Sequence, residues 1–93
     1  MPRTPRLNDA QVEAELLSSP GWRREGDTIR RTWQLGSFAE AMALANRVAA
    51  LAEAQDHHPD ILVQYRRVTL TLSTHDSGGL TELDFRLARA IET

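Results

Sequence analysis

The stretch ILVQYRRVTLTLST, residues 61–74, decides the fold. In its second half valine and leucine alternate strictly with threonine and serine, which is typical of a strand with one buried face. Its first half is rich in β-branched and aliphatic residues, and the polar pair Arg66-Arg67 separates the two halves. The stretch therefore predicts two strands, residues 61–65 and 68–74, joined by a hairpin connection that favours antiparallel pairing.

A helix is expected immediately before these strands. Ser37 and Glu40 form a capping box, and apolar residues follow at helical spacing, so the helix should run from about 38 to 55. Its apolar stripe is expected to comprise Phe38, Met42, Ala45, Ala49 and Ala52. A second flank, with Ala43 and Ala50, is small enough for another helix to approach closely.

Towards the N-terminus the pattern predicts a short helix and a second hairpin. Asn8 is a suitable N-cap with Gln11 three residues later, which predicts a helix over residues 9–18. Residues 21–25 and 28–35, separated by a Gly-Asp turn, predict two further antiparallel strands.

The C-terminal segment predicts a last helix. Two glycines at 78–79 break the chain, and Thr81 is the expected N-cap, with Asp84 at the third helical position. The buried stripe of this helix is expected to comprise Leu83, Leu87, Ala90 and Ile91. An acidic residue in the first turn stabilises a helix whatever the function, so a purely structural role for Asp84 stays open.

The element order is helix, strand, strand, helix, strand, strand, helix, which predicts an α+β fold. We expect a four-stranded antiparallel sheet with the three helices packed on one face, formed by residues 7–93 as a single domain. Residues 1–6 have the composition of a flexible tail. Because the sheet has two open edges that need protection, a homodimer or homotetramer is expected.

The composition excludes several classes of protein and of site. The 93 residues include no cysteine, which rules out disulfides, a thiolate zinc site and a cysteine nucleophile. The formal net charge of -2 argues against a nucleic-acid binder that relies on bulk electrostatics. No apolar run is long enough to span a membrane, and the N-terminus lacks the apolar region of a signal peptide. We therefore expect a cytoplasmic protein with neither a membrane nor a nucleic acid as partner.

All three histidines lie at the ends of predicted elements. His57 and His58 follow the helix over 38–55, and His75 ends the second strand on its polar face. An imidazole titrates near neutral pH, so histidines here suit general acid and base catalysis. Histidines at the C-terminus of a helix also interact favourably with its dipole, and that structural reading stays open. Adjacent histidines are poorly spaced to share one ion, so no metal is expected.

The spacing of the polar residues carries a family resemblance. The chain resembles the pterin-4a-carbinolamine dehydratases in one spaced set: Glu53, three residues, His57-His58-Pro59, five residues, Tyr65, nine residues, His75, eight residues and Asp84. The Gly-Trp pair at 21–22 and the Ser-Thr-His-Asp run at 73–76 are also similar to that family. The resemblance covers residues 7–92.

The resemblance implies an enzyme that dehydrates 4a-hydroxytetrahydropterin, the 4a-carbinolamine, to quinonoid dihydropterin in support of an aromatic amino acid hydroxylase. It implies no cofactor, because the pterin is the substrate. By position, the implied catalytic residues are His57, His58 and His75. The implied substrate-binding residues are Glu53, Asp56, Ser73, Thr74 and Asp84. The sequence leaves open which of the catalytic histidines is the acid and which is the base.

The same resemblance implies a second function. Members of this family also act as dimerisation cofactors for a transcription factor, so the fold is compatible with a non-enzymatic interaction protein. Measuring dehydratase activity of the purified protein separates the two readings.

Overall fold

The computed structural model describes residues 3–92, in which eight elements follow one another. In chain order they are α1 (Asp9–Leu17), β1 (Arg23–Glu25), β2 (Thr28–Gln34), α2 (Phe38–Gln55), β3 (Asp60–Gln64), β4 (Arg67–Leu72), a 3₁₀ turn η1 (His75–Ser77) and α3 (Glu82–Glu92). The order of α-helices and strands is the one that the sequence predicts. Each predicted boundary lies within two residues of the observed one.

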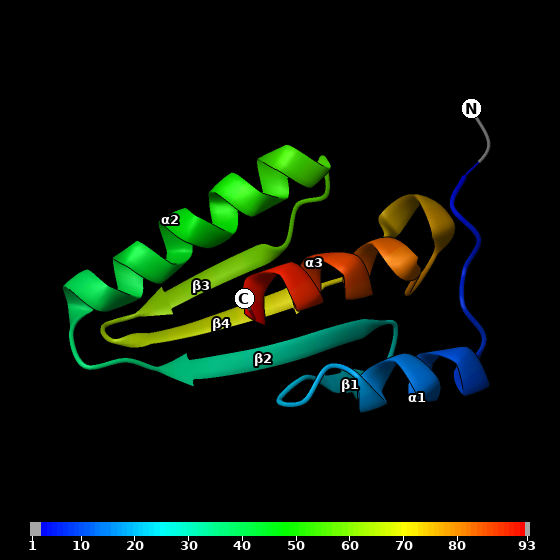
Figure 1. Ribbon diagram of the computed structural model, residues 1–93, viewed down its shortest axis with the longest axis horizontal. Coiled ribbons are helices and arrows are strands. Elements are labelled where there is room, and N and C mark those ends of the chain that lie inside the picture. The colour runs from blue at the N-terminus through cyan, green and yellow to red at the C-terminus, as the bar shows by residue number, and fades with distance from the viewer. Residues whose placement is uncertain (1–2, 93) are drawn as a thin grey trace.

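The four strands form one antiparallel sheet in the order β1-β2-β4-β3. The central strands β2 and β4 place Ile29 opposite Leu72, and the edge strand β3 places Leu62 opposite Thr69. The three α-helices lie on one face of the sheet, and Figure 1 shows α2 and α3 side by side over it. The predicted α+β fold is confirmed.

The core lies between the sheet and the helices. Val68, Leu70 and Leu72 of β4 are fully buried, and the threonines between them face the other side, as the alternation predicts. From α3, Phe85 and Leu87 are also fully buried in the same cluster. Full burial of one such side chain contributes roughly 1.5–3 kcal/mol.

The face that α2 buries differs from the predicted stripe. Phe38 and Met42 are 52% and 39% exposed, whereas Ala41 and Val48 are buried and Leu44 is half-buried. The buried face is turned by roughly 80° from the expected one, at 100° per residue. The physical reason is that this orientation removes valine and leucine side chains from water, which stabilises the fold more than burying alanines does.

The end of β4 also differs from the prediction. The strand stops at Leu72, and His75 begins η1 instead of ending a strand. Thr74 and Gly79 close the loop around η1 with two backbone hydrogen bonds of 3.0 and 3.3 Å. Gly78, with φ of 73°, permits the tight reversal that this loop requires.

The segment before α1 packs against the loop around η1. Ser77 Oγ donates to the carbonyl of Thr4 at 2.5 Å, and the amide of Leu7 donates to the carbonyl of Leu80 at 2.9 Å. The predicted flexibility of residues 1–6 stays a prediction, and residues 1–2 lie outside the described part. Within residues 3–92, no helix has both the length and the hydropathy that crossing a bilayer requires.

Candidate active site

One end of the sandwich brings the segment after α2 against the segment after β4. Between them lies a pocket of about 260 Å³, lined by Asp56, His57, His58, Ser73, Thr74, His75 and Asp76. Two larger hollows, of about 380 and 460 Å³, contain no histidine. The three histidines, which the sequence places after one helix and one strand, therefore share one pocket.

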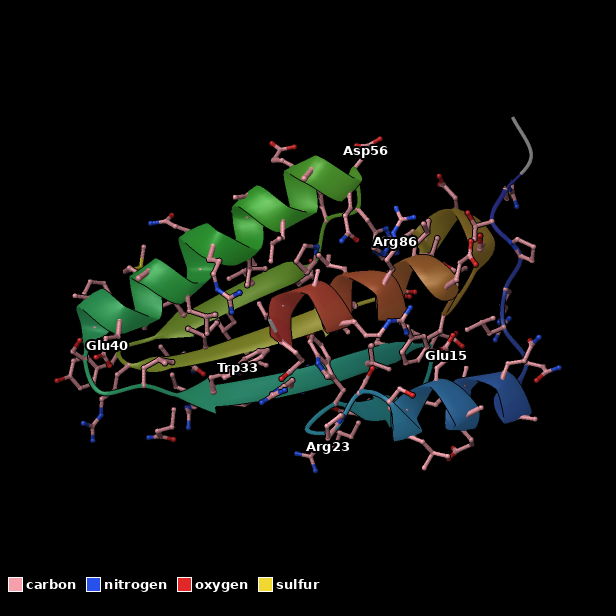
Figure 2. All side chains as sticks on the ribbon, in the orientation of Figure 1. Glu15, Arg23, Trp33, Glu40, Asp56 and Arg86 are labelled. Carbon is pink, nitrogen blue, oxygen red and sulfur yellow. The ribbon has the colours of Figure 1, made fainter. Side chains whose placement is uncertain are left out.

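The end of α2 sets the first wall of this pocket. Asp56 adopts the left-handed conformation, with φ of 49° and ψ of 44°, and so ends the helix. Its amide and that of His57 donate to carbonyls of the last helical turn, which ties the following residues to the helix end. Figure 2 shows Asp56 at the end of α2 that lies towards the η1 turn.

His57 points into the protein and meets a buried carboxylate. Its Nε2 lies 2.6 Å from Oδ1 of Asp84, a residue of α3 with no exposed surface. The second oxygen of Asp84 accepts from the hydroxyl of Thr74 at 2.9 Å and from the amide of Thr81 at 3.0 Å. Every oxygen of this buried carboxylate therefore has a hydrogen-bond partner, as burial of a charge requires.

His58 points outward although it follows His57 directly. Its Nε2 lies 3.1 Å from Oε2 of Glu53, and the two side chains are 57% and 78% exposed. An exposed ion pair contributes roughly 0–1 kcal/mol. The pair is therefore free to rearrange around a ligand.

His75 and Ser73 form the opposite wall. His75 is exposed at the start of η1, with Asp76 beside it. Ser73 is half-buried, and its hydroxyl donates to the carbonyl of Asp27 at 2.7 Å, in the turn between β1 and β2. The oxygen of Ser73 keeps lone pairs that can accept from a ligand.

The eight predicted site residues thus fall into three groups. Six of them line the pocket: Asp56, His57, His58, Ser73, Thr74 and His75. Glu53 joins the site through His58, and Asp84 lies behind His57 without surface of its own.

The contact of Thr74 with Asp84 could not be predicted from local sequence, because it joins the segment after β4 to α3. Thr81, by contrast, was found as a helix cap, because its contact with Asp84 is local.

The geometry bears on metal binding as well. His57 and His58 face different carboxylates, Asp84 and Glu53, and so do not converge on one point. Within residues 3–92 no three side chains of histidine, aspartate or glutamate are grouped as ligands of one ion. The absence of a metal from the active protein stays a prediction.

The histidines that line the pocket can transfer protons to and from a ligand. One imidazole is buried and held by a carboxylate, and two are exposed to any ligand that enters. Such a set can remove a proton at one atom of a ligand and deliver one at another.

Comparisons with known proteins agree on one family. The family profile described as pterin 4 alpha carbinolamine dehydratase matches residues 5–93. A relative from Roseiflexus sp. (strain RS-1) is 54% identical over 87 residues, which is 94% of each chain, and one from Thermomicrobium roseum is 52% identical over 92% of each chain. Both relatives carry the name pterin-4-alpha-carbinolamine dehydratase as a provisional one.

Two solved structures are similar as well. The transcriptional coactivator/pterin dehydratase from Brucella melitensis superposes with a TM-score of 0.89 at 34% identity, over 94% of this chain and 95% of that one. A pterin dehydratase-like protein identified as a RuBisCO assembly factor in the alpha-carboxysome superposes with a TM-score of 0.65 at 27% identity, over 77% and 86%. With a family profile matched over almost its whole length, this chain belongs to the pterin 4 alpha carbinolamine dehydratase family.

Proposed function

We propose that this protein dehydrates 4a-hydroxytetrahydropterin to quinonoid dihydropterin by histidine acid–base catalysis. The observation that carries the proposal is the convergence of His57, His58 and His75 on one pocket. Family membership supports the dehydratase activity. The reaction would serve to recycle the tetrahydropterin of an aromatic amino acid hydroxylase.

The reaction needs two proton transfers and no nucleophile. The hydroxyl group leaves C4a, the proton leaves N5, and a double bond forms between these two atoms. One neutral imidazole accepts the proton from N5, and one imidazolium donates a proton to the departing hydroxyl, which leaves as water. Each positioned acid or base contributes roughly 100-fold to 10,000-fold to the rate.

Two of the site's carboxylates can bind the substrate, and the third binds a histidine. The exposed carboxylate of Glu53 suits the guanidine-like edge of a pterin, and Asp56 lies on the pocket wall where it can accept a further hydrogen bond. Asp84 has no exposed surface, so we assign it to His57 and not to the substrate. No cofactor takes part in the proposed reaction.

The decisive experiment is stopped-flow measurement of 4a-hydroxytetrahydropterin decay with and without the protein. We expect faster decay with the wild-type protein, and decay near the uncatalysed rate with a His58→Ala/His75→Ala double variant, whose replaced residues are both exposed. Equal decay with and without the wild-type protein would exclude the proposed reaction.

A second candidate function is protein interaction. It is supported by the names of the two similar structures, a coactivator and an assembly factor. It is also supported by exposed apolar side chains on α2 and on the helix-covered face of the edge strand β3: Phe38, Met42 and Ile61. We propose that a second copy of this chain covers this surface in a homodimer or homotetramer. Purified protein without dehydratase activity that carries a stoichiometric partner would favour interaction as the main function.

A further inference from the structure

A chain of buried hydrogen bonds extends from His57 into the protein. Behind the imidazole, Oδ2 of Asp84 receives the hydroxyl of Thr74 and the amide of Thr81. The hydroxyls of Thr74 and Thr81 lie 2.8 Å apart, and the hydroxyl oxygen of Thr81 also accepts from the amide of Leu83 at 3.2 Å. Thr81 and Asp84 have no exposed surface and Thr74 is 8% exposed, so little water reaches these groups.

The donors in this chain determine where each proton lies. The amide of Thr81 can only donate, and the hydroxyl of Thr74 has one proton, which it gives to the carboxylate. The hydroxyl of Thr81 then donates to the oxygen of Thr74. Two protons therefore point at Oδ2 of Asp84, which suits an ionised carboxylate. The remaining oxygen, Oδ1, can only accept, so the 2.6 Å bond needs a proton on Nε2 of His57.

This polarity leaves one ring nitrogen of His57 for a ligand. A neutral imidazole with a proton on Nε2 has a lone pair on Nδ1. His57 lines the pocket, and Nε2 is already engaged by Asp84. Only Nδ1 can therefore accept a proton from a bound molecule.

We propose that Thr74 and Asp84 are positioning residues that keep the proton of His57 on Nε2, so that Nδ1 is the base of the dehydration. The inference rests on the proposed function and deepens it, because it assigns the acceptor of the N5 proton. The proton donor to the departing hydroxyl is then one of the exposed histidines, His58 or His75. Thr74 acts through Asp84, and Asp84 acts through His57.

The competing reading is that Asp84 only caps α3. Its bond to the amide of Thr81 is a helix-capping contact and would exist without any catalytic role. The hydroxyl of Thr74, however, lies outside that helix and is not needed for the cap. Removing this hydroxyl therefore tests positioning while the cap stays in place.

The informative substitution at the carboxylate is Asp84→Asn. The fixed donor at Thr81 demands an oxygen at the Oδ2 position, so the amide nitrogen of the new side chain must face His57. An NH₂ group at this place donates to Nε2 and moves the imidazole proton to Nδ1. The base is then blocked by its own proton, and the dehydration rate should fall roughly 100-fold or more.

The experiment is two-bond ¹H–¹⁵N NMR of protein labelled with ¹⁵N-histidine, which identifies the protonated nitrogen of each neutral ring. We expect a proton on Nε2 of His57 in the wild-type protein and on Nδ1 in Asp84→Asn. Thr74→Val removes one of the two donors to Oδ2 and so weakens the preference for a carboxylate that only accepts. We therefore expect a mixture of both tautomers and a rate at least about 10-fold lower than that of the wild type. Thr74→Ser, which restores the hydroxyl, should recover both the tautomer and the rate.

The matched control is Thr69→Val, five residues earlier on β4 and on the sheet face that the helices do not cover. It removes an equivalent hydroxyl contact, the 3.0 Å bond between Thr32 and Thr69, and should change neither tautomer nor rate. Thr74→Val keeps the test valid if Asp84→Asn does not fold, since valine has nearly the shape of threonine.

The outcomes separate the inference from the reaction on which it rests. A wild-type His57 with its proton on Nδ1 overturns the inference, whatever the dehydration rate. The inference is also overturned if a folded Thr74→Val or Asp84→Asn protein still carries the His57 proton wholly on Nε2. A wild-type protein that carries the proton on Nε2 and does not accelerate dehydration refutes the proposed reaction, and with it the assignment of His57 as the base.

Discussion

Replacing His57 by alanine is expected to lower the free energy of unfolding by about 3 kcal/mol. The imidazole lies 2.6 Å from a carboxylate that has no exposed surface. Its removal leaves Oδ1 of Asp84 without a partner, while Thr74 and Thr81 still hold Oδ2. A hydrogen bond to a buried charge contributes roughly 1.5–3 kcal/mol, and loss of the ring also opens a cavity.

The matched control is His58→Ala, the same truncation one residue further along the chain. The pair of His58 with Glu53 is exposed, and such pairs contribute roughly 0–1 kcal/mol. The control should therefore lower the free energy of unfolding by less than about 1 kcal/mol. Both variants lose the same side chain, so the difference between their unfolding free energies measures the effect of burying the imidazole beside Asp84.

Urea unfolding followed by tryptophan fluorescence measures both variants. Trp22 is buried, and its ring centroid lies 5.8 Å from that of Trp33, so the signal reports loss of packing. For a domain of this size, 3 kcal/mol corresponds to a melting temperature lower by roughly 12–24 °C. Protein concentration is kept constant, because the stability of an oligomer depends on it. Equal unfolding free energies for His57→Ala and His58→Ala would refute the energetic role of the buried pair.

Other outcomes concern the reaction, the metal and the assembly. His75→Ala should lower the stopped-flow dehydration rate by roughly 100-fold or more, with little change in stability because His75 is exposed; a wild-type rate would remove it from the mechanism. Dehydration should survive exhaustive chelation, and activity that is lost with the metal and restored by zinc would reverse this prediction. Light scattering should give at least twice the 10.4 kDa chain mass, and a smaller mass for Phe38→Arg or Met42→Arg but not for Gln11→Arg on α1. A wild-type monomer at micromolar concentration would refute the assembly.

The bounds of α2 can be predicted from sequence because they depend on local contacts. The hydroxyl of Ser37 accepts from the amide of Glu40 at 3.1 Å, as the capping box requires. The buried face of the same helix was predicted only in part: Ala52 is buried, whereas Phe38 and Met42 are exposed. The reason is that alanines occur all round the helix and leave no single apolar stripe. The choice between faces depends on which orientation buries Leu44 and Val48 against the sheet, and that is a property of the whole fold.

The candidate site shows the same division between local and tertiary information. The placement of all three histidines at element ends follows from helix and strand patterns. The contact of Thr81 with Asp84 follows from helix capping over three residues. The pair of His57 with Asp84, by contrast, joins residues 27 positions apart, and no local pattern specifies it. Its consequence, that Asp84 is hidden from any ligand, could not be predicted from spacing alone.

The two adjacent histidines differ because of the way α2 ends. Asp56 in the left-handed conformation stops the helix, and the two histidines that follow meet different carboxylates, Asp84 and Glu53. His57 turns inward to a carboxylate that is itself held by two donors, while His58 stays outside with the exposed carboxylate of Glu53. In the proposed dehydration, a base that removes the N5 proton would gain from a fixed position, whereas a proton donor would have to follow a hydroxyl group that moves away from C4a. One short segment thus provides a rigid imidazole and an adaptable one, and the buried carboxylate determines which of the two is rigid.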